Sequence, residues 1–179
     1  MRVAEEPSHL RKVAMTRLHV RVRFATAALA VALLPVAVAA ASEEVRLVLL
    51  DHAGLQKLVE SKRGQVVVMD AWSTYCEPCM REFPGLVGLH KKYGDRLACI
   101  SVCANYSGIG KPEEEVDEPL KFLKEKGAAF DNVLSTEKDE TLYKKLGIAS
   151  VPCIFVFDRD GKLLKKFENE AKYAEIEAF

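Results

Sequence analysis

The sequence has no excess of charge of either sign. Its 179 residues carry 26 lysines and arginines against 26 aspartates and glutamates, a formal net charge of zero at pH 7. Proteins that bind nucleic acid usually show a basic surface, and nothing in this composition indicates one. The chain after residue 41 also has no repeat and no low-complexity segment. Its length and its hydrophobic content of 49% suit one globular domain with a core of its own.

Closely spaced cysteines are also scarce. Of the five cysteines, only Cys76 and Cys79 have C-x-x-C spacing, and the only other close pair is Cys99 and Cys103. A four-thiolate zinc site needs a second C-x-x-C, so the spacing argues against one and we expect no metal. Cys99 and Cys103 would stand about 13 Å apart along one strand, too far for a disulfide. We expect both to be small, buried hydrophobic residues.

The first 41 residues differ in composition from the rest. They hold six basic and two acidic residues, and three arginines precede the uncharged run Phe24–Ala41, which ends in small residues. A basic end, an apolar middle and an A-x-A cut site are the layout of an export signal peptide. The sequence therefore predicts a signal peptide over residues 1–41 and an exported, periplasmic or otherwise extracytoplasmic domain over residues 42–179.

A membrane anchor retained over residues 24–41 is an alternative. The 18-residue run would reach about 27 Å as a helix, close to the thickness of a bilayer core. It is rich in alanine and contains Pro35, so it is only weakly hydrophobic, which favours cleavage. An ordinary buried helix is a further reading. A start at Met15 instead of Met1 would give the basic end a more usual length.

Hydrophobic periodicity predicts alternating strands and helices after the leader. Continuous apolar runs indicate buried strands, and apolar residues at helical spacing indicate helices. The expected strands span residues 45–50, 65–72, 97–103, 130–134, 152–157 and 163–167, and the expected helices span residues 52–62, 78–93, 116–127, 142–146 and 171–179. Pro84 should kink the second helix. The order implies an α/β fold, a central mixed β-sheet flanked by helices on both faces.

Cys76 and Cys79 lie where a strand ends and a helix begins. A short loop lets the two sulfurs meet, so a disulfide can form and break with little backbone movement. The start of the helix directs free N–H groups toward the first sulfur and stabilises a thiolate there. We therefore expect Cys76 to attack a substrate disulfide and Cys79 to resolve the mixed disulfide. A permanent structural disulfide is the alternative.

Three carboxylates accompany the dithiol. Asp70 interrupts an apolar strand, where burial would raise its pKa and let it exchange a proton with Cys79. The alternative for Asp70 is a strand aspartate that pairs with a lysine or faces water. Glu77 and Glu82 place negative charge near Cys76, which disfavours its thiolate and favours a reducing pair. The alternative for Glu82 is an exposed glutamate that pairs with a lysine or arginine.

The motifs together resemble the thioredoxin superfamily. The segment from Trp72 to Cys79 is similar to its W-x-x-x-C-x-x-C, and Val151-Pro152 matches its cis-proline. The segment from Phe155 to Lys162, and the Glu-Phe-Pro that follows the dithiol, resemble the TlpA/ResA branch of exported thiol–disulfide oxidoreductases. The resemblance covers about residues 45–179. It implies a thioredoxin-like fold and a redox-active disulfide as the only redox group, with no other cofactor.

The resemblance also implies roles for residues around the dithiol. Pro152 is expected to be cis, and Val151 to offer backbone hydrogen bonds to an extended substrate. Glu82 matches an active-site glutamate of the ResA-like proteins, and Cys153, next to the cis-proline, becomes a candidate third redox or copper-binding thiol. The expected substrate-binding residues are Trp72, Tyr75, Glu77, Pro78, Val151 and Pro152, with Trp72 also readable as a core residue.

Departures from the pattern leave the redox potential and substrate open. Tyr75 stands where tryptophan is usual, Cys153 where threonine is common, and Asp70 where the TlpA branch more often has asparagine. By resemblance we expect a monomer that reduces protein disulfides, in cytochrome c biogenesis or copper-protein maturation, with electrons from a membrane thiol–disulfide donor. A thioredoxin-like copper-binding chaperone is the alternative. A peroxiredoxin-like peroxidase would need a different spacing around its cysteine.

Overall fold

The computed structural model describes residues 44–169 and 173–179. The predicted leader over residues 1–41, with its alternative as a membrane anchor, lies outside these residues. Among the helices that are described, none combines the length and the apolar character that crossing a membrane requires.

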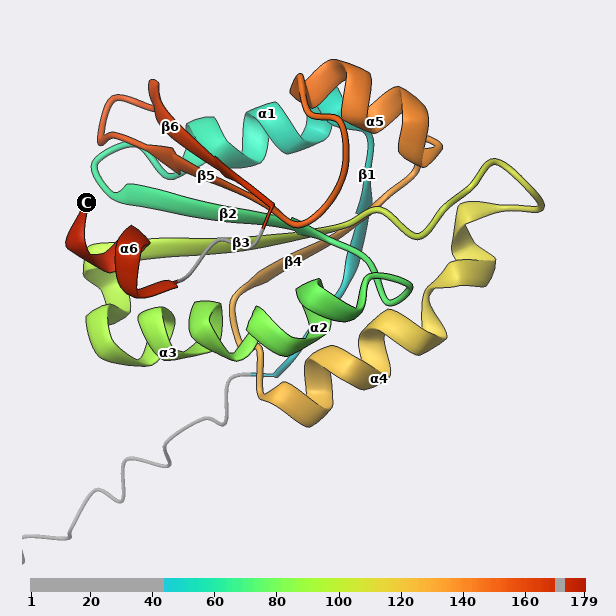
Figure 1. Ribbon diagram of the computed structural model, residues 1–179, viewed down its shortest axis with the longest axis horizontal. Helices are drawn as coiled ribbons and strands as arrows, with labels where there is room; N and C mark the ends of the chain where they lie inside the picture. The colour runs from blue at the N-terminus through green and yellow to red at the C-terminus, as the bar shows by residue number, and fades with distance from the viewer. Residues whose placement is uncertain (1–43, 170–172) are drawn as a thin grey trace, which may run out of the picture. The chain divides into compact units, whose positions relative to one another are not determined.

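A mixed sheet lies at the centre of the domain (Figure 1). In the described part of the chain six strands pair in the order β1-β4-β3-β2-β5-β6. The strands β1 to β4 run parallel to one another, and β5 runs antiparallel to both β2 and β6. The strands are β1 Val48–Leu50, β2 Val66–Trp72, β3 Leu97–Cys103, β4 Asp131–Ser135, β5 Cys153–Phe157 and β6 Leu163–Glu168.

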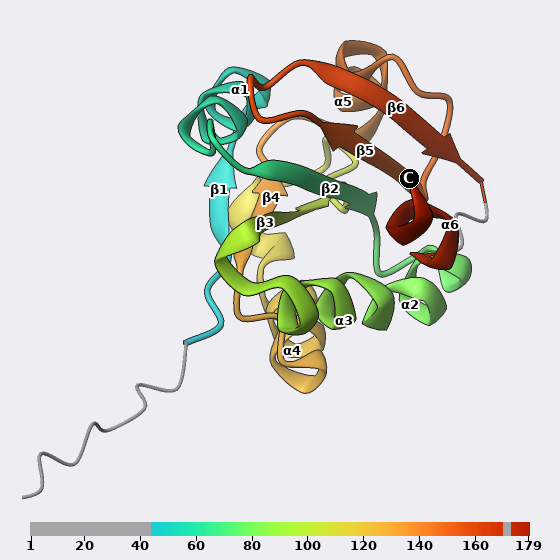
Figure 2. The same ribbon diagram turned by 90° about the vertical axis from the view of Figure 1, so that its left-hand side faces the viewer.

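Helices cover both faces of the sheet (Figure 2), as the sequence predicts. One face carries α1 (His52–Ser61) and α5 (Asp139–Leu146). The other face carries four helices, namely α2 Glu77–Glu82, α3 Pro84–Tyr93, α4 Asp117–Lys126 and α6 Tyr173–Ala178. Two short 3-10 helices, Gly94–Arg96 and Pro112–Glu115, precede β3 and α4.

The central strand β2 separates two apolar cores. Its side chains alternate between the faces, so Val67, Met69 and Ala71 join the core beneath α1 and α5. Val68 and Trp72 join the core beneath the other four helices. Asp70 lies between Val68 and Trp72 on the same face of β2. Its side chain therefore points toward the helical layer that contains the dithiol.

The second predicted helix and the first predicted strand differ from the structure. The helix expected over residues 78–93 is divided into α2 and α3, with the break at Phe83 and Pro84. Proline has no N–H to continue the hydrogen-bond ladder, and the break lets the Phe83 ring enter the core with no exposed surface. The first strand is shorter than expected, because only Val48–Leu50 pairs with β4.

Candidate functional site

The two cysteines of the C-x-x-C motif form a disulfide at the start of α2. Their Cα atoms are 5.2 Å apart, and Cys76 occupies the N-cap position of the helix. Its sulfur accepts a hydrogen bond from the backbone N–H of Cys79 at 3.3 Å. Cys76 is half-buried, whereas Cys79 is 1% exposed. An incoming reactant therefore meets Cys76 first, and Cys79 lies behind it in bonding position.

The loop before β5 lies against the first cysteine. The Val151–Pro152 bond is cis, as the resemblance implies. The carbonyl oxygen of Val151 lies 3.6 Å from the sulfur of Cys76. Both residues line an open cleft of about 370 Å³, together with Tyr75, Asn105 and others. An extended peptide in this cleft would have backbone groups within reach of both Cys76 and Val151.

Asp70 lies beneath the dithiol layer and is 3% exposed. Burial raises the pKa of this carboxyl from 3.8 to about 7, although a hydrogen bond from Tyr173 acts in the opposite direction. The Tyr173 hydroxyl donates to Oδ2 at 2.6 Å. Among the described residues Oδ1 has no hydrogen-bond partner. Asp70 is thus buried and hydrogen-bonded to a tyrosine. It neither pairs with a described lysine nor faces water, which were the alternatives from the sequence.

The two glutamates of α2 share one arginine. Arg81 donates to Glu77 at 3.1 Å and to Glu82 at 3.2 Å. The Glu77 side chain is 84% exposed and that of Glu82 is 33% exposed. Arg81 therefore offsets part of the negative charge that the sequence places near Cys76. The catalytic role expected for Glu82 stays a prediction, and its ion pair matches the alternative reading.

Tyr75 projects from the loop before Cys76 and is 72% exposed. Its hydroxyl lies 3.5 Å from a carboxylate oxygen of Glu115, and Glu118 accepts a hydrogen bond from Thr74 at 3.3 Å. The negative charge of Glu115, with that of Glu118, raises the pKa of Tyr75. The exposed ring beside the cleft is compatible with the substrate contact expected for Tyr75.

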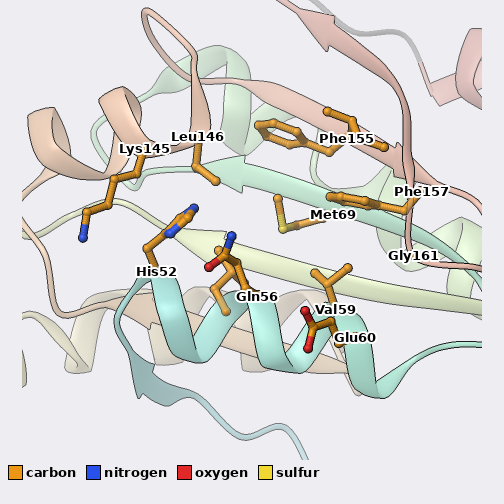
Figure 3. Close-up of a pocket in the computed structure, with 12 residues that line it drawn as sticks. His52, Gln56, Val59, Glu60, Met69, Lys145, Leu146, Phe155, Phe157 and Gly161 are labelled. Atoms are coloured by element: carbon orange, nitrogen blue, oxygen red, sulfur yellow. The ribbon is translucent and has the colours of Figure 1, made fainter.

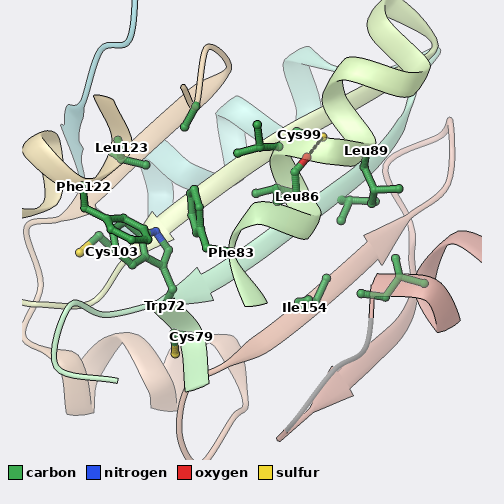
Figure 4. Packing of buried hydrophobic residues seen from close by; sticks show 14 of the residues in the cluster. Trp72, Cys79, Phe83, Leu86, Leu89, Cys99, Cys103, Phe122, Leu123 and Ile154 are labelled. Atoms are coloured by element: carbon green, nitrogen blue, oxygen red, sulfur yellow. Dashed lines mark hydrogen bonds between the residues drawn. The ribbon is translucent and has the colours of Figure 1, made fainter. Parts of the chain in front are cut away.

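Trp72 is a core residue and has no exposed surface. Its ring lies 5.0 Å from the ring of Phe83 and 5.0 Å from that of Phe122, centroid to centroid (Figure 4). The expectation that Trp72 contacts substrate is therefore corrected in favour of the core reading. Since Phe83 joins α2 to α3, Trp72 supports the dithiol helix from below.

Asn105 was not expected from the sequence, yet it anchors the loop that leads to Cys76. Its side-chain oxygen accepts hydrogen bonds from the Ser73 hydroxyl at 2.9 Å and from the Thr74 N–H at 3.0 Å. Its amide donates to the Thr74 hydroxyl at 2.7 Å, and the Cys103 sulfur lies 3.1 Å from its oxygen. Asn105 follows the carboxyl end of β3, and functional groups often lie at this edge of a parallel sheet. That position is the one feature of the sequence that could have indicated a role for Asn105.

Replacement of Asn105 by alanine is expected to destabilise the protein by about 1–3 kcal/mol, because it leaves the buried Ser73 hydroxyl and the Thr74 N–H without their acceptor. Urea unfolding followed by the fluorescence of Trp72, the single tryptophan, measures the loss. The exposed Ser107→Ala, from the same loop, is the control. Equal stability of the two variants would contradict this account.

The three remaining cysteines are free and buried, as expected for Cys99 and Cys103. Burial raises the pKa of the Cys99 thiol and of the Cys153 thiol to about 12, and it raises that of Cys103 as well. Cys153 has no exposed surface. Within residues 44–169 and 173–179, no group of three or more His, Cys, Asp or Glu side chains is placed to hold a metal ion.

A second pocket lies on the opposite face of the sheet (Figure 3). It has a volume of about 240 Å³ and is lined by α1, by the carboxyl end of α5 and by aromatic residues of β5. His52 and Lys145 lie at one end, whereas Met69 lines the pocket from β2 and Phe155 from β5. It contains no cysteine. The pocket is therefore separate from the dithiol site.

The geometry of the dithiol suits electron exchange with another disulfide. Cys76 is accessible and Cys79 is buried behind it, which is the arrangement that attack and resolution require. The site and the mixed sheet between two helical layers make this protein a thiol–disulfide oxidoreductase with a thioredoxin-like fold. A family model described as thioredoxin-like matches residues 64–163, more than half of the chain, and the chain belongs to that family.

Relatives and solved structures agree with this assignment. The chain is 29% identical to the thiol-disulfide oxidoreductase ResA of Geobacillus thermodenitrificans over 72% of its own length and 69% of the relative's. The chain is 26% identical to ResA of Bacillus thuringiensis, over 74% of its own length and 71% of the relative's. The exposed lipoprotein thioredoxin Etrx1 of Streptococcus pneumoniae has a similar fold, with a TM-score of 0.55 at 18% identity over 67% of this chain and 86% of that one.

Proposed function

We propose that this protein is an exported reductase of protein disulfides, in which the Cys76–Cys79 pair is the only redox group. The observation that carries the proposal is the placement of the half-buried Cys76 sulfur beside the Val151 carbonyl on an open cleft. A segment of substrate protein in that cleft would place its disulfide against Cys76. We assign export to residues 1–41 as a cleaved leader, on the pattern of the sequence alone.

The charges near Cys76 support reduction as the direction of the reaction. Glu115 and Glu118 lie on the Tyr75 side of the dithiol. Negative charge disfavours the Cys76 thiolate, and a pair whose reduced form is less stabilised is more reducing. As a monomer, the protein would pass electrons from a membrane thiol–disulfide donor to cytochrome c or copper-site precursors. Copper binding is less favoured, because the buried Cys153 gives the dithiol no accessible third thiol.

The reduction potential of the Cys76–Cys79 pair tests the direction. We expect a value below about −200 mV, the range of reductases, from equilibration with glutathione buffers and quantification of the free thiols. A value near about −120 mV would indicate an oxidase and overturn the proposal. The Asp160→Asn variant serves as a control, since it changes an exposed residue in the turn between β5 and β6 and should leave the potential unchanged.

A further inference from the structure

The carboxyl-terminal helix reaches the buried acid of the site through one side chain. Tyr173, the first residue of α6, donates its hydroxyl to Oδ2 of Asp70 at 2.6 Å across 103 residues of sequence. Burial raises the pKa of the Tyr173 hydroxyl further above its usual value, so it acts as a donor at neutral pH. This bond is the one described polar contact of the Asp70 side chain.

A glycine in α3 makes room for the tyrosine. A Cβ atom at Gly85 would lie 2.3 Å from two ring carbons of Tyr173, a distance that no real contact tolerates. A Cβ atom at Gly88, three residues further along the same helix, would enter open space with no other atom within 4 Å. The ring of Tyr173 therefore packs directly on the backbone of α3, and position 85 accepts only glycine without moving it.

The second oxygen of Asp70 has no partner among the residues described. Its neighbour in register on β3, Ser101, donates its hydroxyl to Asn132 instead. Within the described part of the chain, the carboxyl thus has one oxygen that accepts from Tyr173 and one oxygen without a partner. The titratable groups that face this pair from the surrounding elements are Cys99 on β3, Cys153 on β5 and Glu82 on α2.

We propose that Tyr173 is a positioning residue, which holds Oδ2 of Asp70 so that Oδ1 takes the proton of Cys79 in the resolving step. The inference rests on the proposed function. In that step the Cys79 sulfur bonds to Cys76 and its proton passes to Asp70, while the bond between Cys76 and the substrate breaks. The substrate leaves as a thiolate and takes a proton from water. The substrate disulfide is the oxidant, and the dithiol is oxidised.

Loss of the tyrosine hydroxyl is expected to move this step to higher pH. The hydrogen bond stabilises the carboxylate, so removing it makes Asp70 a proton acceptor only in more alkaline solution. A hydrogen bond to a charged group is strong enough to move the midpoint of the pH profile by about one pH unit. In Tyr173→Phe, the pH at which resolution is half-maximal should therefore rise by about that amount.

The experiment follows resolution alone, in a single turnover of the reduced full-length protein. Reaction with an aromatic disulfide such as dithiobis-nitrobenzoate releases one coloured thiol as Cys76 attacks and a second as Cys79 resolves, and stopped-flow absorbance separates the two phases. Tyr93→Phe is the matched control, because its hydroxyl donates to Glu177 of α6 at 2.7 Å and does not touch Asp70. Its profile should follow that of the unmodified protein.

A pair of glycine variants tests the same contact from the other side. Gly85→Ala should displace the ring and shift the profile in the direction of Tyr173→Phe, whereas Gly88→Ala should leave it in place. Unchanged profiles of both Tyr173→Phe and Gly85→Ala would overturn the inference, provided that Asp70→Asn alters the profile. An unchanged profile in Asp70→Asn would instead contradict the proton-transfer role of Asp70 itself.

Discussion

Replacement of Cys76 by serine is expected to reduce the rate of protein-disulfide reduction to that of the reaction without enzyme. The thiolate is the attacking group, and a serine hydroxyl at the same position cannot form a mixed disulfide. Cys79, at 1% exposure, is not accessible enough to replace it. Reduction of insulin by dithiothreitol, followed as turbidity with and without the variant, measures the effect.

Replacement of Cys79 by serine should have a different result. Cys76 can still attack, but nothing releases the substrate, so the mixed disulfide accumulates and is detected by mass spectrometry of the intact protein. Asp160→Asn, which changes an exposed residue in the turn between β5 and β6, should keep full activity. Turnover by Cys76→Ser at the rate of Asp160→Asn would remove Cys76 from the mechanism and with it the proposed reaction.

Much of the fold could be predicted because it follows from local sequence. The strand over residues 97–103 has the predicted bounds, since a continuous apolar run between polar segments leaves little freedom in placing its ends. The sequence predicts a kink at Pro84, because a proline inside a helix removes an interior hydrogen bond, and the structure has a break there. The shorter β1 was not predictable, because its length depends on how much of β4 lies opposite it.

Some residues of the candidate site could be predicted from the sequence, and others could not. Cys76 and Cys79, and the cis bond at Pro152, could be expected from spacing and resemblance, and the structure places Val151 against Cys76. The contacts of Asn105 and Tyr173 could not be expected. Their residue types are common, and their partners lie more than thirty residues away in sequence. Such contacts depend on the packing of whole helices, on which local sequence carries no information.

Replacement of Asp70 by asparagine is expected to stabilise the oxidised protein increasingly as the pH rises. The pKa of Asp70 is about 7 in the folded protein, compared with 3.8 as the ordinary value. Between these values the unfolded chain is ionised and the folded protein is not, so raising the pH lowers the free energy of unfolding. At about 1.36 kcal/mol per pH unit, this interval corresponds to about 4 kcal/mol.

The sign is set by the direction of the shift. A folded-state pKa above the unfolded value makes the stabilising contribution complete below pH 3.8 and lost as the pH rises through about 7. Asparagine carries no proton in this range, so the difference in unfolding free energy between Asp70→Asn and the unmodified protein should widen with pH. Comparing this difference across pH cancels the constant effect of the substitution on packing.

Urea unfolding of both oxidised proteins between pH 4 and pH 8, followed by Trp72 fluorescence, measures that difference. Asp160→Asn, in the exposed turn between β5 and β6, controls for the loss of one aspartate at the surface. A constant difference for Asp70→Asn would mean that the carboxyl is ionised in the folded protein throughout. Its pKa would then lie below pH 4, and Asp70 could not retain a proton taken from Cys79 near neutral pH. A widening difference would show that the protein gives up stability at high pH to keep a proton-exchanging acid beneath its dithiol.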